Sequence, residues 1–299
     1  MSDSAKICPL VGPPIGKPRY NHQVHAPILL LATLLSADLT IDHVTVCGNN
    51  LKEMQAALAS IGIQTEFGGK HSNGATQMAV ASFPDGSYME LMAPQTNPDQ
   101  KALADHYWSK QMLGNAGPTA WAVRAKDVTA EVERLAAAHI TVSSPSHSGR
   151  QRPDGQRLEW ETARVGPEPN GTFFPFLIRD FTPREARAFP NGKPSGPDIS
   201  GVKRVIIAVR DLNASAKRFQ QAYGLSAPTR KDDPSLDAHT ARFEGTPIIL
   251  AAPRTPQSWI AKRIQQFGEG PCAFTVGSLK SIDTRKLSWH LSIESPTEP

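Results

Sequence analysis

The pattern of apolar and polar positions predicts a strand, a helix and three more strands near the start of the folded part of the chain. Residues 39–47 alternate between apolar and polar side chains, which is typical of a strand with one buried face. Residues 50–60 place Leu51, Met54 and Leu58 on one face of an amphipathic helix. The three further strands are expected at 63–67, 75–83 and 87–94.

The same succession of elements is predicted again along the rest of the chain. A second unit starts at Gly117, a third covers residues 201–253, and a fourth starts at Gly270 with too few residues for all its strands. The second unit is expected to contain a strand at 119–125, a helix at 128–138 and strands at 140–144, 156–165 and 172–181. The third is expected to contain a strand at 202–209, a helix at 213–223 and strands at 239–245 and 246–253, and residues 286–294 are expected to close the fourth.

Three pairs of segments indicate that the chain contains one arrangement twice. The matching pairs keep the same order: IDHVTVCGNNL (41–51) with VKRVIIAVRDL (202–212), YMELMAP (88–94) with PIILAAP (247–253), and GPTAWAVRA (117–125) with GPCAFTVGS (270–278). Internal repetition of this kind fixes the architecture before single elements are assigned. The repeat replaces His43 by Arg204 and Glu90 by Ile249, so a site built on this histidine and glutamate is expected in the first half.

Length and composition are ordinary for a globular protein. The 299 residues carry a formal net charge of +4, and no run of Lys or Arg with interleaved aromatics marks a nucleic-acid surface. The three cysteines are far apart and lack a Cys-x-x-Cys spacing, which argues against a disulfide framework and a structural zinc site. We therefore expect no nucleic-acid partner and no transmembrane segment.

The chain is expected to divide into a leader and two halves. Residues 1–37 are the leader, and their apolar run at 26–37 has the length of a signal-peptide core but is too short to span a bilayer. Cleavage near Ala37 would make the protein exported or periplasmic, whereas a leader that packs as a short helix on the domain would leave it cytoplasmic. A domain at 38–182, a linker at 183–200 rich in Pro, Gly and Ser, and a degenerate second half at 201–299 follow.

Four motifs in a fixed order resemble a known superfamily. Tandem βαβββ units that open with Asp42-His43-Val44 resemble the vicinal oxygen chelate superfamily, which includes glyoxalase I, extradiol dioxygenases and bleomycin-resistance proteins. The other motifs are similar to those of the glyoxalase-like domain family: Gly68-Gly69-Lys70-His71, Ser87-Tyr88-Met89-Glu90-Leu91, and Arg152-Pro153-Asp154-Gly155 followed by Leu158 and Trp160. The resemblance is good over residues 41–182 and weaker over 201–294. It implies an internally duplicated α+β fold whose tandem βαβββ modules pair into curled mixed β-sheets and form a cup for a small-molecule ligand.

In that superfamily the first strand of a module supplies a histidine and the fourth a glutamate, which here are His43 and Glu90. Imidazole and carboxylate are ligands that zinc, iron, manganese or nickel accepts, with positions left open for a chelating substrate. Period-two alternation points both side chains into the cup. The same alternation turns four apolar neighbours toward the helices: Val44, Val46, Met89 and Leu91.

The second module departs from the pattern, because Ala120 stands where His43 stands in the first and an alanine cannot bind metal. A third ligand has to come from elsewhere. His71 is the first candidate, and Glu159 and Glu161 are alternatives. Without a metal, Glu90 would orient His43 as a general base.

Four residues are candidates for substrate binding: His71, Arg152, Asp154 and Trp160. The guanidinium of Arg152 suits a carboxylate or phosphate, although Arg150, Arg152 and Asp154 can also form a simple charged hairpin. His71 belongs either to the site or to a surface turn, and Trp160 either to the core or to the ligand wall. Residues 106–108 are expected to pack in a connecting helix.

Three functions remain open from the sequence. A metal-dependent lyase, isomerase or dioxygenase would use a metal on His43 and Glu90 as a Lewis acid for a substrate with adjacent oxygens. A metal-free binding protein of the bleomycin-resistance type would sequester its ligand, and a scaffold with vestigial sites would do neither. The halves can pair within one chain or between the two chains of a homodimer.

Overall fold

Residues 39–152, 154–278 and 280–295 are described by the computed structural model, and all of them belong to the same structural unit. The predicted leader, with its possible signal peptide, lies outside the described residues. Within the described part of the chain, every helix is too short or too polar to cross a membrane.

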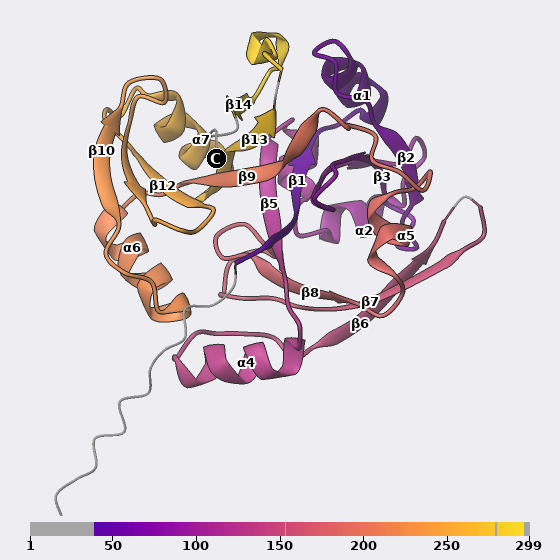
Figure 1. The fold of residues 1–299 in the computed structure, drawn as a ribbon, viewed down its shortest axis with the longest axis horizontal. Coiled ribbons are helices and arrows are strands. Elements are labelled where there is room, and N and C mark those ends of the chain that lie inside the picture. Colours follow the sequence, from indigo (N-terminus) through magenta and orange to yellow (C-terminus); the bar gives the residue numbers. More distant parts are fainter. Residues whose placement is uncertain (1–38, 153, 279, 296–299) are drawn as a thin grey trace, which may run out of the picture. The chain divides into compact units, whose positions relative to one another are not determined.

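Eight strands of the N-terminal half form one mixed sheet in the order β2-β3-β4-β1-β5-β8-β7-β6 (Figure 1). The first module contains β1 (Ile41–Cys47), α1 (Leu51–Ala59), β2 (Glu66–Lys70), β3 (Thr76–Ser82) and β4 (Tyr88–Pro94). The second contains β5 (Gly117–Arg124), α4 (Val128–Ala137), β6 (Ser146–Gln151), β7 (Arg157–Ala163) and β8 (Phe176–Asp180). In each module the first strand runs parallel to the fourth, and β1 pairs antiparallel with β5. Two βαβββ modules therefore join through their first strands.

The C-terminal half repeats this plan incompletely, in a six-stranded sheet of order β10-β11-β12-β9-β13-β14. Its elements are β9 (Ile199–Ala208), α6 (Leu212–Tyr223), β10 (Thr229–Asp233), β11 (Ala238–Arg242), β12 (Ile248–Pro253), α7 (Trp259–Phe267), β13 (Gly270–Ser278), a 3-10 turn (Thr284–Lys286) and β14 (His290–Glu294). Here β9 runs parallel to β12 and β13 parallel to β14. The fourth module has only an opening and a closing strand among the described residues, as its length predicted. The internally duplicated α+β fold is confirmed.

Capping residues fix where the module helices begin. The side chains of Asn50, Asp127 and Asp211 accept hydrogen bonds from backbone N–H groups in the first turns of α1, α4 and α6. Such caps satisfy donors that a helix start leaves unpaired. Each module helix thus starts directly after its first strand and folds back onto the sheet.

One hydrophobic core runs through both halves. Val44 and Val46 of β1 and Met89 of β4 are buried against Leu51 and Leu58 of α1, as alternation predicted. The same core includes Phe219 of α6, whose ring centroid lies 4.9 Å from that of Phe174 in the first half. Since these side chains use one face of β1 and β4, the opposite face is left for a site.

Two strand predictions were wrong. The strand expected at 140–144 is replaced by an isolated bridge between Val142 and Val165, and the pairing strand β6 follows it. β10 was not predicted at all. Both β6 and β10 are polar edge strands, with the sequences SHSGRQ and TRKDD, so they lack the apolar alternation that marks a strand.

Three short helices lie in connections: α2 (Gln100–Asp105), α3 (Ser109–Leu113) and α5 (Arg184–Ala188). α5 falls inside the segment 183–200, which was expected to be a linker. The division into domains at 38–182 and 201–299 stays a prediction, and the contacts of α5 described below show what the connecting segment does.

Candidate functional site

A cavity of about 240 Å³ lies on the face of the eight-stranded sheet that α1 leaves free. Its walls come from β1, β3 and β4 of the first module and from β6, β7 and β8 of the second. Strands far apart in the sheet order can line one cavity only if the sheet curls strongly. The guanidinium of Arg150 in β6 donates a hydrogen bond to the carbonyl of Gly68 in β2. This contact joins the two edge strands of the sheet and closes the cup.

His43 and Glu90 reach this cavity from neighbouring parallel strands. Nε2 of His43 lies 3.9 Å from Oε2 of Glu90, which is too long for a hydrogen bond. The same carboxylate oxygen accepts a hydrogen bond from Thr45 Oγ1 at 3.3 Å. The ring of His43 stacks on that of Tyr88, with centroids 4.8 Å apart. The imidazole is therefore held on one side while its Nε2 faces Glu90.

Asp42 determines the tautomer of His43. Its Oδ1 lies 2.6 Å from Nδ1 of His43, and the side chain is 1% exposed. Burial alone would raise the pKa of Asp42, but the charge of Arg187, the hydrogen bond from His43 and the charge of Arg184 hold that pKa well below its ordinary value. An ionised carboxylate only accepts hydrogen bonds. Nδ1 consequently carries a proton, which leaves Nε2 as the ring nitrogen that faces the cavity.

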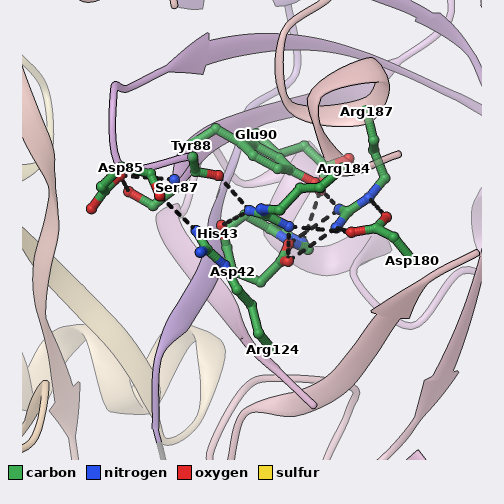
Figure 2. A network of polar contacts seen from close by, with 11 residues as sticks. Asp42, His43, Asp85, Ser87, Tyr88, Glu90, Arg124, Asp180, Arg184 and Arg187 are labelled. Atoms are coloured by element: carbon green, nitrogen blue, oxygen red, sulfur yellow. Dashed lines mark hydrogen bonds and ion pairs between the residues drawn. The ribbon is translucent and has the colours of Figure 1, made fainter. Parts of the chain in front are cut away.

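Two arginines of α5 neutralise Asp42 (Figure 2). Nη2 of Arg187 lies 3.0 Å from Asp42 Oδ2 and 2.9 Å from Asp180 Oδ2, and Nη1 donates to the hydroxyl of Tyr88. Arg184 pairs with Asp42 as well and donates to the carbonyl of Gly86. The predicted linker thus supplies the counter-ions of the carboxylate that orients His43.

The structure brings together four of the predicted site residues. His71 and Trp160 line the same cavity as His43 and Glu90, whereas Arg152 and Asp154 do not. Arg152 donates to the carbonyls of Ala186, at 2.8 Å, and Pro190, and it pairs with Asp154 at 2.8 Å. These contacts hold the hairpin of β6 and β7 against the α5 segment, in the charged hairpin that was the alternative to ligand binding by Arg152.

Sequence reasoning missed several residues of the cavity. His106, Tyr107 and Trp108 line it, although packing within a connecting helix was expected. Burial lowers the pKa of His106 to about 4. Burial also lowers the pKa of His71 against the opposing charge of Glu90. Both imidazoles are neutral at neutral pH and can act as hydrogen-bond partners. Consecutive aromatic side chains after a short helix were the signal that could have revealed this wall.

The donors in the cavity fall short of a three-ligand metal site. His43 Nε2 and the Glu90 carboxylate are of the right type, and Nδ1 of His71 is hydrogen-bonded to Thr76 at 2.8 Å, which leaves Nε2 as the one ring nitrogen that His71 could offer. Among the described residues, no group of three or more His, Cys, Asp or Glu side chains could hold an ion. The alternatives, Glu159 and Glu161, pair with Arg157 and Arg179. Catalytic metals usually take three protein ligands, so these side chains do not fit a resident divalent metal.

The equivalent face of the C-terminal sheet is filled. Ile260 and Ile264 of α7 pack there on Ile206 of β9 and on small side chains of β12 and β13. Arg204, the counterpart of His43, pairs with Glu294 at 2.9 Å. Apolar packing therefore occupies the place that the cavity holds in the first half.

Comparison with known proteins agrees with this architecture. The family model described as the glyoxalase-like domain matches residues 41–222. A hypothetical protein from Staphylococcus aureus aligns with 86% of this chain and 99% of its own, with a TM-score of 0.64 and 12% identity. A mutant of 4-hydroxymandelate synthase from Streptomyces coelicolor aligns with 80% of this chain and 70% of its own, with a TM-score of 0.52 and 14% identity. At such identities the likeness shows the fold alone. No curated protein matches the chain.

Proposed function

Since the chain belongs to the glyoxalase-like domain family, we propose that its cavity is an active site for proton transfer on a small carbonyl compound. One observation carries the proposal. Asp42 holds Nδ1 of His43 at 2.6 Å, and the free Nε2 faces Glu90 within a cavity. An imidazole oriented by a buried carboxylate, with a second acid–base group beside it, is the arrangement that general acid–base catalysis needs.

His43 acts as the general base in this proposal. Nε2 takes a proton from the carbon next to the carbonyl, and the carboxylate of Asp42 stabilises the imidazolium that forms. Glu90 is the second acid–base group and exchanges a proton with a neighbouring substrate atom. Return of the proton to a different atom gives isomerisation, and departure of a leaving group gives a lyase reaction.

Every step of this route uses side chains of the chain itself, because the donor set does not fit a resident metal. The ring of Tyr88 and the ion pairs of Arg187 keep the imidazole in place before substrate arrives. Such preorganisation spares the enzyme the cost of ordering its base during the reaction.

Deuterium exchange tests the proposal because it detects proton abstraction whatever product is formed. The protein is incubated in D2O with a panel of 2-oxo acids, hydroxyketones and thiol–aldehyde adducts, and loss of the α-proton signal is followed by ¹H NMR. We expect faster exchange for at least one compound and a loss of about 100-fold or more in His43→Ala. His239→Ala is the matched control, because His239 lies exposed in the second half and pairs only with Asp232.

Two outcomes would contradict the proposal: no accelerated exchange with any compound, or full exchange activity in His43→Ala. A parallel sample treated with chelator and then with zinc, iron, manganese or nickel tests the metal-dependent alternative. Activity that disappears with the chelator and returns with one metal would replace the metal-free route by a chelate mechanism on His43 and Glu90.

Aromatic walls favour a second candidate, a protein that sequesters its ligand without chemistry. Five aromatic side chains line the cavity: Tyr88, Tyr107, Trp108, Trp160 and Phe176. Rings of this kind bind planar ligands through stacking and apolar contact. The same NMR samples separate the two functions, since a sequestering protein broadens the ligand signals while the α-proton signal keeps its intensity.

A further inference from the structure

Two arginines are almost completely buried among the described residues, and their surroundings differ. Arg187 is 3% exposed and lies between the carboxylates of Asp42 and Asp180. Arg150 is 7% exposed and has one hydrogen bond, from Nη1 to the carbonyl of Gly68. In the described part of the chain, no carboxylate oxygen lies within the 4.0 Å of an ion pair from its guanidinium. Arg150 is therefore a buried cation without an ion pair, and although the charge of Glu90 in the same cavity favours its charged form, burial lowers its pKa overall.

A buried charge without a partner is costly, so its presence needs an explanation. The contact with Gly68 uses one N–H group of a guanidinium that carries several. The same residue lines the cavity that contains His43 and Glu90. Its remaining N–H groups are available to a molecule in that cavity.

Neighbouring side chains extend the polar surface around Arg150. Ser148 lies two residues earlier on β6, on the same face of the strand, and also lines the cavity. Trp160 of β7 is paired with Ser148 in register and offers an aromatic wall beside them. The guanidinium, the hydroxyl and the aromatic ring together suit a ligand in which a carboxylate is attached to an apolar group.

We propose that Arg150 binds the carboxylate of the small molecule whose reactive carbon lies at His43 and Glu90. The inference rests on the proposed function for the position of the reacting carbon. A guanidinium matches the planar carboxylate with two parallel hydrogen bonds. The charge of Glu90 in the same cavity disfavours a dianionic phosphate, so the expected ligand is a monoanionic acid. The anion-binding role predicted for Arg152 thus moves to the arginine two residues before it.

Binding of benzoate and of its neutral analogue benzamide, measured by isothermal titration calorimetry, tests the inference. The wild-type protein should bind benzoate tighter than benzamide by about tenfold or more, because only benzoate supplies the missing charge. R150Q should abolish this preference, and R150K should retain part of it. E90Q should strengthen benzoate binding, since it removes a like charge from the cavity. R157Q is the matched control and should behave as the wild type, because Arg157 lies exposed on the same hairpin and pairs with Glu159.

The result that overturns the inference is equal affinity of the wild-type protein for both probes, or an unchanged preference in R150Q. Circular dichroism and thermal unfolding show whether R150Q folds. If R150Q does not fold, the inference is judged by two results: the preference of the wild type for benzoate over benzamide, and the part of this preference that R150K retains.

The two proposals fail separately. Exchange of α-protons from neutral carbonyl compounds, without any preference for benzoate, would retain the proton-transfer function and remove the role of Arg150. An Arg150-dependent preference for benzoate without exchange of any compound would retain the carboxylate site and remove the catalysis.

Discussion

Replacing Arg187 by methionine tests whether the α5 segment holds the site together. The guanidinium contacts both oxygens of Asp42, both oxygens of Asp180 and the hydroxyl of Tyr88. After its removal, Asp42 keeps Arg184 and His43, and Asp180 keeps Arg184 at 3.4 Å. Removing one partner of a buried pair costs about 3–5 kcal/mol. We expect the free energy of unfolding at neutral pH to fall by that amount.

The loss should depend on pH with a defined sign. The pKa of Asp42 lies well below its ordinary value of 3.8 in the folded protein, so its ion pairs stabilise the fold above that value and cease to do so as the pH falls through the folded pKa. Without Arg187 the pKa of Asp42 should rise, because one of the charges that oppose the effect of burial is missing. The difference in stability between wild type and variant should therefore be largest at neutral pH and shrink on acidification below 3.8.

Urea unfolding followed by circular dichroism, at neutral pH and at about pH 3, measures both effects. Arg204→Met is the matched control, because it breaks a more exposed ion pair with Glu294 and should cost about 1 kcal/mol or less. A loss in Arg187→Met no larger than in this control, or one that is the same at both pH values, would refute the reasoning.

Three further predictions concern the same site. Tyr88→Phe removes a hydroxyl that accepts from Arg187 but keeps the ring that stacks on His43, so urea unfolding should show a loss of about 1.5–3 kcal/mol. Chelator should leave deuterium exchange unchanged, and a chelator-sensitive activity would contradict the metal-free route. The imidazole of His106 should titrate near pH 4 by NMR, and its contribution to stability should be lost as the pH falls from 6.5 toward 4.

The repeat and the alternation of β1 and β4 predicted the βαβββ modules, and the resemblance to the superfamily added how the modules pair and that His43 and Glu90 share a site. A strand with one face in a core must turn the next side chain to the other face. Once Val44 and Met89 are assigned to the core, their neighbours His43 and Glu90 have to face away from it. The alternation in the sequence and the orientation of these side chains in the fold agree, because the burial of one face of β1 and β4 determines both.

The supporting residues could not be predicted, since none of them belongs to a local pattern. Asp42 immediately precedes the expected site residue, but its partners Arg184 and Arg187 are more than a hundred residues away. Their segment is rich in Pro, Gly and Ser, which indicates a connection and not an element with buried charges. Only the folded chain shows that α5 lies against the start of β1.

Arg152 was named as a candidate from the sequence and Arg150 was not, for a related reason. Residues two apart on a strand share a face, so the sequence offered both arginines to the same cavity. β6 ends at Gln151, however, and the alternation stops before Arg152. An end point that differs by one residue decides which arginine lines the cavity, and polar edge strands give little signal about their ends.

The position of α5 between the two repeats has a consequence for how such a chain can evolve. Duplication usually yields copies that can be separated again by recombination at the segment between them. In this protein a break after residue 182 would leave Asp42 buried in the first copy without the arginines that neutralise it. The smallest piece that keeps the first copy intact is therefore longer than the repeat itself, because it includes the two arginines of α5.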